Sequence, residues 1–90
     1  MSNFEKETLA RLQAIGRRIG ELRAKRRLTQ AQLAERLDRS LNMVQIWEKG
    51  TNIQAKTLFL LSKVLDCRVE EFFKPPKTER PKPGHPKARK

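Results

Sequence analysis

All five prolines of the chain lie between residues 75 and 86, within the basic closing segment KPPKTERPKPGHPKARK. This segment has no large apolar residue, so it cannot contribute to a packed core. Its composition is typical of an extended, solvated arm with polyproline-like stretches. We therefore expect the folded part of the chain to end near residue 73 and the tail at 75–90 to be disordered.

The chain as a whole can build only one small core, because it has 90 residues of which 37% are hydrophobic. The single Cys67 can form no internal disulfide, and with the single His85 it cannot complete a zinc site. The sequence shows no carboxylate pair, nucleophile elbow or glycine-rich phosphate loop. We therefore expect no enzymatic activity, no cofactor and no bound metal. The absence of a long apolar run or a signal-peptide pattern predicts a cytoplasmic protein without a membrane segment.

The net charge of +11 indicates a polyanionic partner. Residues 74–90 hold seven Lys and Arg against one Glu, and residues 1–73 hold fourteen Lys and Arg against nine Asp and Glu. More than half of the excess therefore belongs to the tail. A basic arm of this kind is predicted to follow phosphates without sequence preference, although a purely solubilising role remains open.

Apolar residues recur every three or four positions between residues 9 and 22, which predicts a helix. Ser2 and Glu5 have the spacing of a capping box, so this helix is expected to begin almost at the N-terminus. Two glycines within the run, the first of them Gly16, weaken a helix interior. The stretch is therefore either one long helix or two segments that part near Gly16.

Further helical segments are predicted at 30–37, 41–49 and 55–65, followed by a short apolar stretch at 69–73. Thr29 and Ser40 are suited to cap the first two, and Gly50 is suited to stop the second. No segment alternates apolar and polar residues as a half-buried strand does. The fold class expected is all-α, with about five helices.

The helices at 30–37 and 41–49 flank a turn of three residues, which predicts a helix-turn-helix motif. The motifs LTQAQLAERL, VQIWEKG and TLFLLSKVLDCRVEEFF resemble the DNA-binding domain of Xre or phage Cro/CI-type repressors. The resemblance implies a five-helix, lambda-repressor-like domain at 15–74, preceded by a helical extension at 1–14 and followed by the tail at 75–90.

The same resemblance assigns structural roles. It implies a partly buried ion pair between Arg23 and Glu48, and it places Asp38 where the family usually has glycine in a left-handed conformation. Small Ala34 is expected where the two helices cross. The expected core positions around the motif are Leu22, Leu33, Leu37, Val44 and Trp47.

Residues 42, 45, 46 and 49 share one face of the second helix because they are three, four and seven positions apart. The resemblance places Leu41, Asn42, Gln45 and Ile46 in base-facing positions, and Gln30 in a position that contacts phosphate and braces this helix. Asn and Gln side chains suit adenine, since each offers a donor and an acceptor together. The predicted DNA-binding residues are Gln30, Arg39, Ser40, Leu41, Asn42, Met43, Gln45, Ile46 and Lys49. Further phosphate contacts are expected from Arg17, Arg18, Arg26 and Arg27.

Apolar Leu41, Met43 and Ile46 stand where the family more often has polar residues. Two interpretations are open: these side chains contact thymine methyl groups in an A·T-rich operator, or they contact a protein partner and DNA binding is weakened. A second group of apolar residues predicts a homodimer contact, with a fuller core as the alternative. The group consists of Phe59, Leu60, Phe72 and Phe73.

The favoured hypothesis is a sequence-specific regulator of double-stranded DNA, most simply a repressor that occupies a promoter. We call the helix at 41–49 the reading helix, because it would enter the major groove. A homodimer would set its two reading helices about 34 Å apart, which is one duplex turn. The competing hypotheses are a protein-interaction module such as an antitoxin or accessory factor, and an RNA or nonspecific nucleic-acid binder that depends on the tail.

Overall fold

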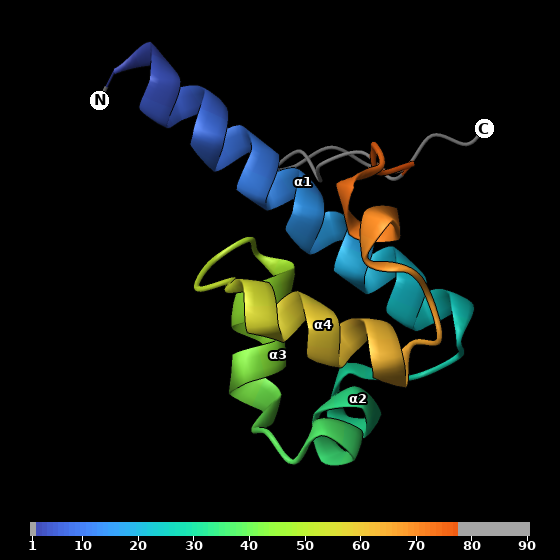
Figure 1. The fold of residues 1–90 in the computed structure, drawn as a ribbon. Coiled ribbons are helices and arrows are strands. Elements are labelled where there is room, and N and C mark those ends of the chain that lie inside the picture. Colours follow the sequence, from blue (N-terminus) through green and yellow to red (C-terminus); the bar gives the residue numbers. More distant parts are fainter. Residues whose placement is uncertain (1, 78–90) are drawn as a thin grey trace, which may run out of the picture.

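A computed structural model describes residues 2–77, in which the chain forms four α-helices and one 3-10 helix and no strand (Figure 1). The elements are α1 (Asn3–Lys25), α2 (Gln30–Leu37), α3 (Leu41–Glu48), α4 (Ala55–Val64) and η1 (Val69–Phe73). The all-helical prediction is confirmed, and the fifth expected helical segment is a 3-10 helix. Most of the tail predicted to be disordered, residues 78–90, lies outside the described residues. No helix within the described range is both long and apolar enough to cross a membrane.

Helix α1 runs without a break through Gly16, so the alternative of two shorter helices is wrong. It begins at the predicted capping box: the Glu5 amide donates to Ser2 Oγ at 3.1 Å, and the Ser2 amide donates to Glu5 Oε1 at 2.9 Å. Its first turns stand clear of the other helices (Figure 1), and Phe4 and Leu9 are exposed. The predicted apolar stripe therefore reaches further toward the N-terminus than the core does.

Gly16 is the point of closest approach between α1 and the end of α3. A Cβ atom at this position would lie 2.6 Å from both the Glu48 carbonyl oxygen and the Gly50 nitrogen. Such a distance is far inside van der Waals contact, and both neighbours are backbone atoms that cannot rotate away. Packing between helices therefore requires glycine here, although glycine is unfavourable within a continuous helix.

The core lies where all five elements meet. Its fully buried members are Ile19, Leu33, Val44, Leu61, Leu65 and Phe72. Trp47 and Ala34 are buried with them, as predicted from the spacing of the motif, and Leu37 packs against them from a partly buried position. The core therefore joins both helices of the motif to α1, α4 and η1.

Capping hydrogen bonds and left-handed residues mark the ends of α2 and α3. Thr29 Oγ1 accepts a hydrogen bond from the Gln32 amide at 3.0 Å, which confirms the predicted cap of α2. Asp38 adopts φ 57° at the end of this helix, the left-handed conformation expected for it. Helix α3 ends at Glu48, one residue earlier than predicted, and Gly50 follows with φ 87°. The three-residue turn therefore sets α3 against α2 as the motif requires.

Candidate nucleic-acid interface

Helix α3 has an inner face held by the core and an outer face open to solvent. Val44 and Trp47 are buried on the inner side, whereas Asn42 and Gln45 are exposed on the outer side. Ser40 begins the helix by accepting a hydrogen bond from the Met43 amide at 3.1 Å. The packing of one face thus fixes which side chains the other face presents.

The predicted DNA-binding residues on and around α3 divide by exposure. Exposed are Arg39, Ser40, Leu41, Asn42, Gln45 and Lys49, while Gln30, Met43 and Ile46 are partly buried. Met43 packs against the core, and its sulfur lies 4.0 Å from the Asn52 side-chain nitrogen. Of the three apolar residues singled out in this helix, Leu41 alone is exposed, with 43% of its surface open.

Glu48 ties the end of α3 to α1 and to the start of α2. Arg23 Nε donates to Glu48 Oε2 at 2.6 Å, which confirms the ion pair that the resemblance implied. Gln30 Nε2 donates to Glu48 Oε1 at 3.0 Å. Gln30 therefore braces the reading helix, as predicted, from the first turn of α2. Because both partners hold one carboxylate, α3 is fixed in orientation relative to both neighbouring helices.

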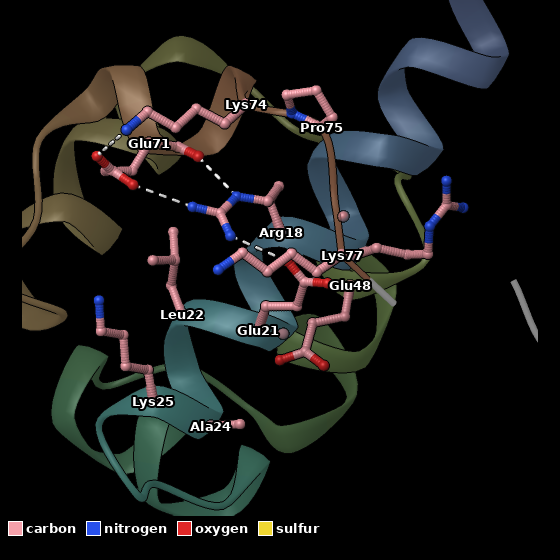
Figure 2. A pocket seen from close by; sticks show the side chains of 13 residues that line it. Arg18, Glu21, Leu22, Ala24, Lys25, Glu48, Glu71, Lys74, Pro75 and Lys77 are labelled. Atoms are coloured by element: carbon pink, nitrogen blue, oxygen red, sulfur yellow. Dashed lines mark hydrogen bonds and ion pairs between the residues drawn. The ribbon is translucent and has the colours of Figure 1, made fainter. Parts of the chain in front are cut away.

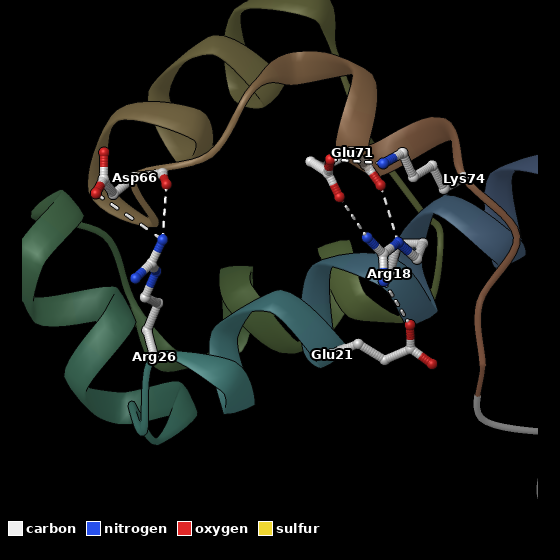
Figure 3. Close-up of polar contacts among 6 residues, drawn as sticks. All are labelled: Arg18, Glu21, Arg26, Asp66, Glu71 and Lys74. Atoms are coloured by element: carbon white, nitrogen blue, oxygen red, sulfur yellow. Dashed lines mark hydrogen bonds and ion pairs between the residues drawn. The ribbon is translucent and has the colours of Figure 1, made fainter.

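Two of the arginines expected to contact phosphate are occupied within the fold (Figure 3). Arg18 is buried, donates to the Glu71 carbonyl oxygen at 2.8 Å and pairs with Glu21 and Glu71 at 2.9 and 3.0 Å. Arg26 donates to the Leu65 and Asp66 carbonyl oxygens, each at 2.7 Å. The prediction for Arg18 is wrong, because its guanidinium joins α1 to η1. Arg26 caps the end of α4 instead of standing free.

Arg27 and Arg39 are exposed, and within residues 2–77 Arg39 donates only to the backbone oxygens of Leu37 and Asp38, at 3.2 and 3.3 Å. Arg17 is partly buried and lines a groove along α1 that the segment from Glu71 to Lys77 also borders (Figure 2). Exposed basic side chains therefore flank helix α3 in the sequence, with Arg39 just before its start and Lys49 just after its end.

Sequence reasoning missed the polar side chains that follow α3. Asn52, Gln54 and Lys56 line a small hollow of about 140 Å³ together with the predicted residues Arg39 and Met43. Asn52 holds a left-handed conformation, with φ 58°, in the loop between α3 and α4. The stretch TNIQ at 51–54 is recognisable as a loop between two predicted helices, but its position beside the reading helix depends on how α4 packs.

Three of the four residues of the predicted homodimer contact are exposed to solvent. Phe59, Leu60 and Phe73 are exposed by 57%, 38% and 61%. Phe72 is wrong as a dimer residue, because it is fully buried in the core. The consecutive residues of η1 point in different directions, so that one phenylalanine closes the core and the next faces solvent.

A comparison with models of known protein families identifies the same helix-turn-helix motif. A family model described as helix-turn-helix matches residues 19–72, which run from the second half of α1 to η1. The chain belongs to the helix-turn-helix family. The match confirms the resemblance to Xre and Cro/CI-type domains, and it makes the protein a DNA-binding regulator of the helix-turn-helix class. Searches of curated proteins and of solved structures found no match.

Proposed function

We propose that this helix-turn-helix protein is a sequence-specific repressor that reads the major groove with α3 and acts by occupying a promoter, without chemistry of its own. The observation that carries the proposal is the exposure of Asn42 and Gln45 on the outer face of a helix whose inner face is anchored by Val44 and Trp47. An amide side chain on a helix anchored in this way can pair with adenine N6 and N7.

The neighbouring side chains favour an A·T-rich site. Leu41 is exposed one position from Asn42, and Ile46 is partly open one position from Gln45. Each is placed to meet a thymine methyl group beside an adenine contact. Arg39 and Lys49 at the ends of α3, with Gln54 and Lys56 in the following segment, supply phosphate contacts.

The protein is proposed to bind as a homodimer through the exposed side chains of Phe59, Leu60 and Phe73. Two-fold pairing would place the reading helices about 34 Å apart, on successive turns of one duplex face. The expected operator is therefore an inverted repeat.

Selection from a random duplex pool at physiological salt tests the proposal. An enriched, two-fold symmetric, A·T-rich site is expected. Failure to enrich any site would favour the protein-interaction alternative, in which exposed Leu41 contacts a partner protein.

Substitutions test the assignment of the reading helix on the selected site. Asn42→Ala and Gln45→Ala are each expected to lose about 1 to 3 kcal/mol of binding free energy. Asn3→Ala is the matched control, since Asn3 is exposed on the N-terminal extension of α1. Parental affinity in both α3 variants would show that other residues read the site.

A further inference from the structure

The N-terminal extension of α1, residues 3–14, lies outside the residues 19–72 that the helix-turn-helix family model matches. Its residues up to Arg11 are all exposed and stand clear of the other helices (Figure 1). Among them are two large apolar side chains, Phe4 with 81% and Leu9 with 44% of its surface open. The extension therefore presents apolar side chains that the fold itself does not cover.

The face that α1 turns toward the core continues into this extension. Steps of three and four residues along α1 define one stripe. Its members are Phe4, Thr8, Leu12, Ile15, Ile19 and Leu22. The last three belong to the core or pack against it, whereas Phe4 and Thr8 are exposed and Leu12 is partly buried. The stripe therefore leaves the core and runs on as a face without a covering element.

Thr8 suits the middle of this face although it is a polar residue. Its Oγ1 donates to the Phe4 carbonyl oxygen at 2.8 Å, so the hydroxyl is satisfied within its own helix and loses no hydrogen bond when the face is covered. Thr8 is also small, and it lies four residues from both Phe4 and Leu12. A second helix can therefore approach closely at Thr8, between the two larger side chains.

The charges beside the face favour a second copy of the same helix in antiparallel orientation. Glu7 and Arg11 border one edge of the face, four residues apart, and neither forms an ion pair within residues 2–77. In an antiparallel pair of identical helices like edges meet, so Glu7 of each copy lies beside Arg11 of the other. In a parallel pair unlike edges meet, and the other edge of the extension holds Glu5 and Leu9 but no cation.

We propose that the extension binds the extension of a second copy of the chain, in an antiparallel two-fold contact centred on Thr8. Phe4 of each copy packs against Leu12 of the other, because these two residues lie equally far on either side of Thr8. The contact uses α1 alone, whereas the homodimer proposed above uses α4 and η1, so the extension joins one dimer to another. Loss of this contact leaves each dimer intact.

Disulfide cross-linking of the full chain tests the contact without DNA, so its outcome is independent of the proposed DNA-binding function. Cys67→Ser removes the single native thiol, and Thr8→Cys in that background places two thiols opposite each other at the two-fold axis. Oxidised glutathione is expected to cross-link Thr8→Cys at least about tenfold faster than Ala10→Cys, an exposed control on the opposite face of α1. Equal rates would overturn the proposal, because the face would then be open or covered by another molecule.

Further substitutions in the Thr8→Cys protein test the packing and the orientation. Phe4→Glu is expected to slow cross-linking by at least about tenfold, whereas Ala10→Glu adds the same charge on the opposite face and should leave the rate unchanged. Glu7→Arg alone is expected to slow cross-linking by about threefold, and addition of Arg11→Glu should restore it, because the reversed charges pair again. An unchanged rate in Phe4→Glu, or no recovery when both charges are reversed, would overturn the proposed contact.

Discussion

Two glycines four residues apart on α1 meet different neighbours. Gly16 faces backbone atoms of Glu48 and Gly50 at 2.6 Å from an added Cβ, whereas Gly20 faces the Glu48 side-chain oxygen at 3.0 Å. Backbone atoms at a helix crossing cannot move alone, but a carboxylate can shift by a few tenths of an ångström. Substitution by alanine should therefore destabilise the fold at Gly16, where the packing cost exceeds the gain in helix propensity. At Gly20 the gain in propensity should roughly offset the packing cost.

Gly16→Ala is expected to lower the free energy of unfolding by about 2 to 3 kcal/mol, even after the helix gains about 1 kcal/mol from the propensity of alanine. Gly20→Ala is expected to change it by less than about 1 kcal/mol, because the propensity gain offsets the shift of Glu48. Urea denaturation of both variants measures the difference. Similar losses in the two proteins would contradict the close approach at Gly16.

Glu71 links η1 to α1 and responds to pH. Its side chain accepts a hydrogen bond from Lys74 Nζ at 2.8 Å, and this bond, with the charges of Lys74 and Arg18, lowers the pKa of the carboxyl group below its ordinary 4.5. A carboxyl group with a lower pKa in the folded state stabilises the fold above its unfolded pKa. That contribution is lost as the pH falls through the folded value.

Glu71→Gln is therefore expected to be less stable than the parent at neutral pH and to show a smaller loss of stability on acidification below about pH 4.5. Thermal unfolding followed across this pH range measures both effects. Glu70→Gln is the control, since Glu70 is exposed and its nearest ion-pair contact, to Arg68, is 3.8 Å long. The same pH profile in the parent and in Glu71→Gln would rule out this contribution.

At the scale of the elements, α4 divides its residues between two surfaces. Leu58 and Leu61 are buried, while Phe59 and Leu60 between them face solvent. Phe73 in η1 is a further exposed large apolar side chain. An isolated exposed leucine is ordinary, but adjoining large apolar side chains are typical of a contact surface.

Phe59→Glu is expected to weaken self-association by at least about tenfold, because pairing would bury the new charge. Sedimentation across a range of protein concentrations measures the effect. Phe4→Glu supplies the control, since Phe4 is still more exposed but lies on the N-terminal extension of α1. If Phe4→Glu dissociated the protein and Phe59→Glu did not, the dimer contact would lie on α1.

For the whole molecule, the basic residues that produce the net charge of +11 fall into groups with different roles. Arg18, Arg23 and Arg26 join helices to one another, so they are engaged within the fold. The last thirteen residues carry five Lys and Arg, and their sequence has no apolar residue larger than alanine or proline. Their contribution to DNA binding is expected to be electrostatic and independent of sequence.

Replacement of residues 78–90 by a neutral Ser-Gly segment of equal length is expected to weaken binding to specific and random duplexes alike. It should also reduce the slope of log K against log salt by about 0.9 for each phosphate that the tail neutralises in the parent. Affinities measured at several salt concentrations test this. An unchanged slope would mean that the tail neutralises no phosphate.

The helices and their limits follow from neighbours in the chain. Capping at Ser2, Thr29 and Ser40, the left-handed Asp38 and the burial of Trp47 are all predictable, because each depends on residues within one or two helical turns. The exposed face of α3 follows from the same periodicity. These features are local, and any fold that kept the motif would retain them.

The roles of Arg18, Arg26 and the two phenylalanines of η1 depend instead on residues far away in the sequence. Arg18 meets Glu71 across 53 positions, Arg26 meets the end of α4, and Phe72 rather than Phe73 closes the core. Gly16 is indispensable only because α3 ends against it. Packing between distant segments decides such matters, since exposed and buried arginines or phenylalanines look alike until the helices that enclose them are assembled.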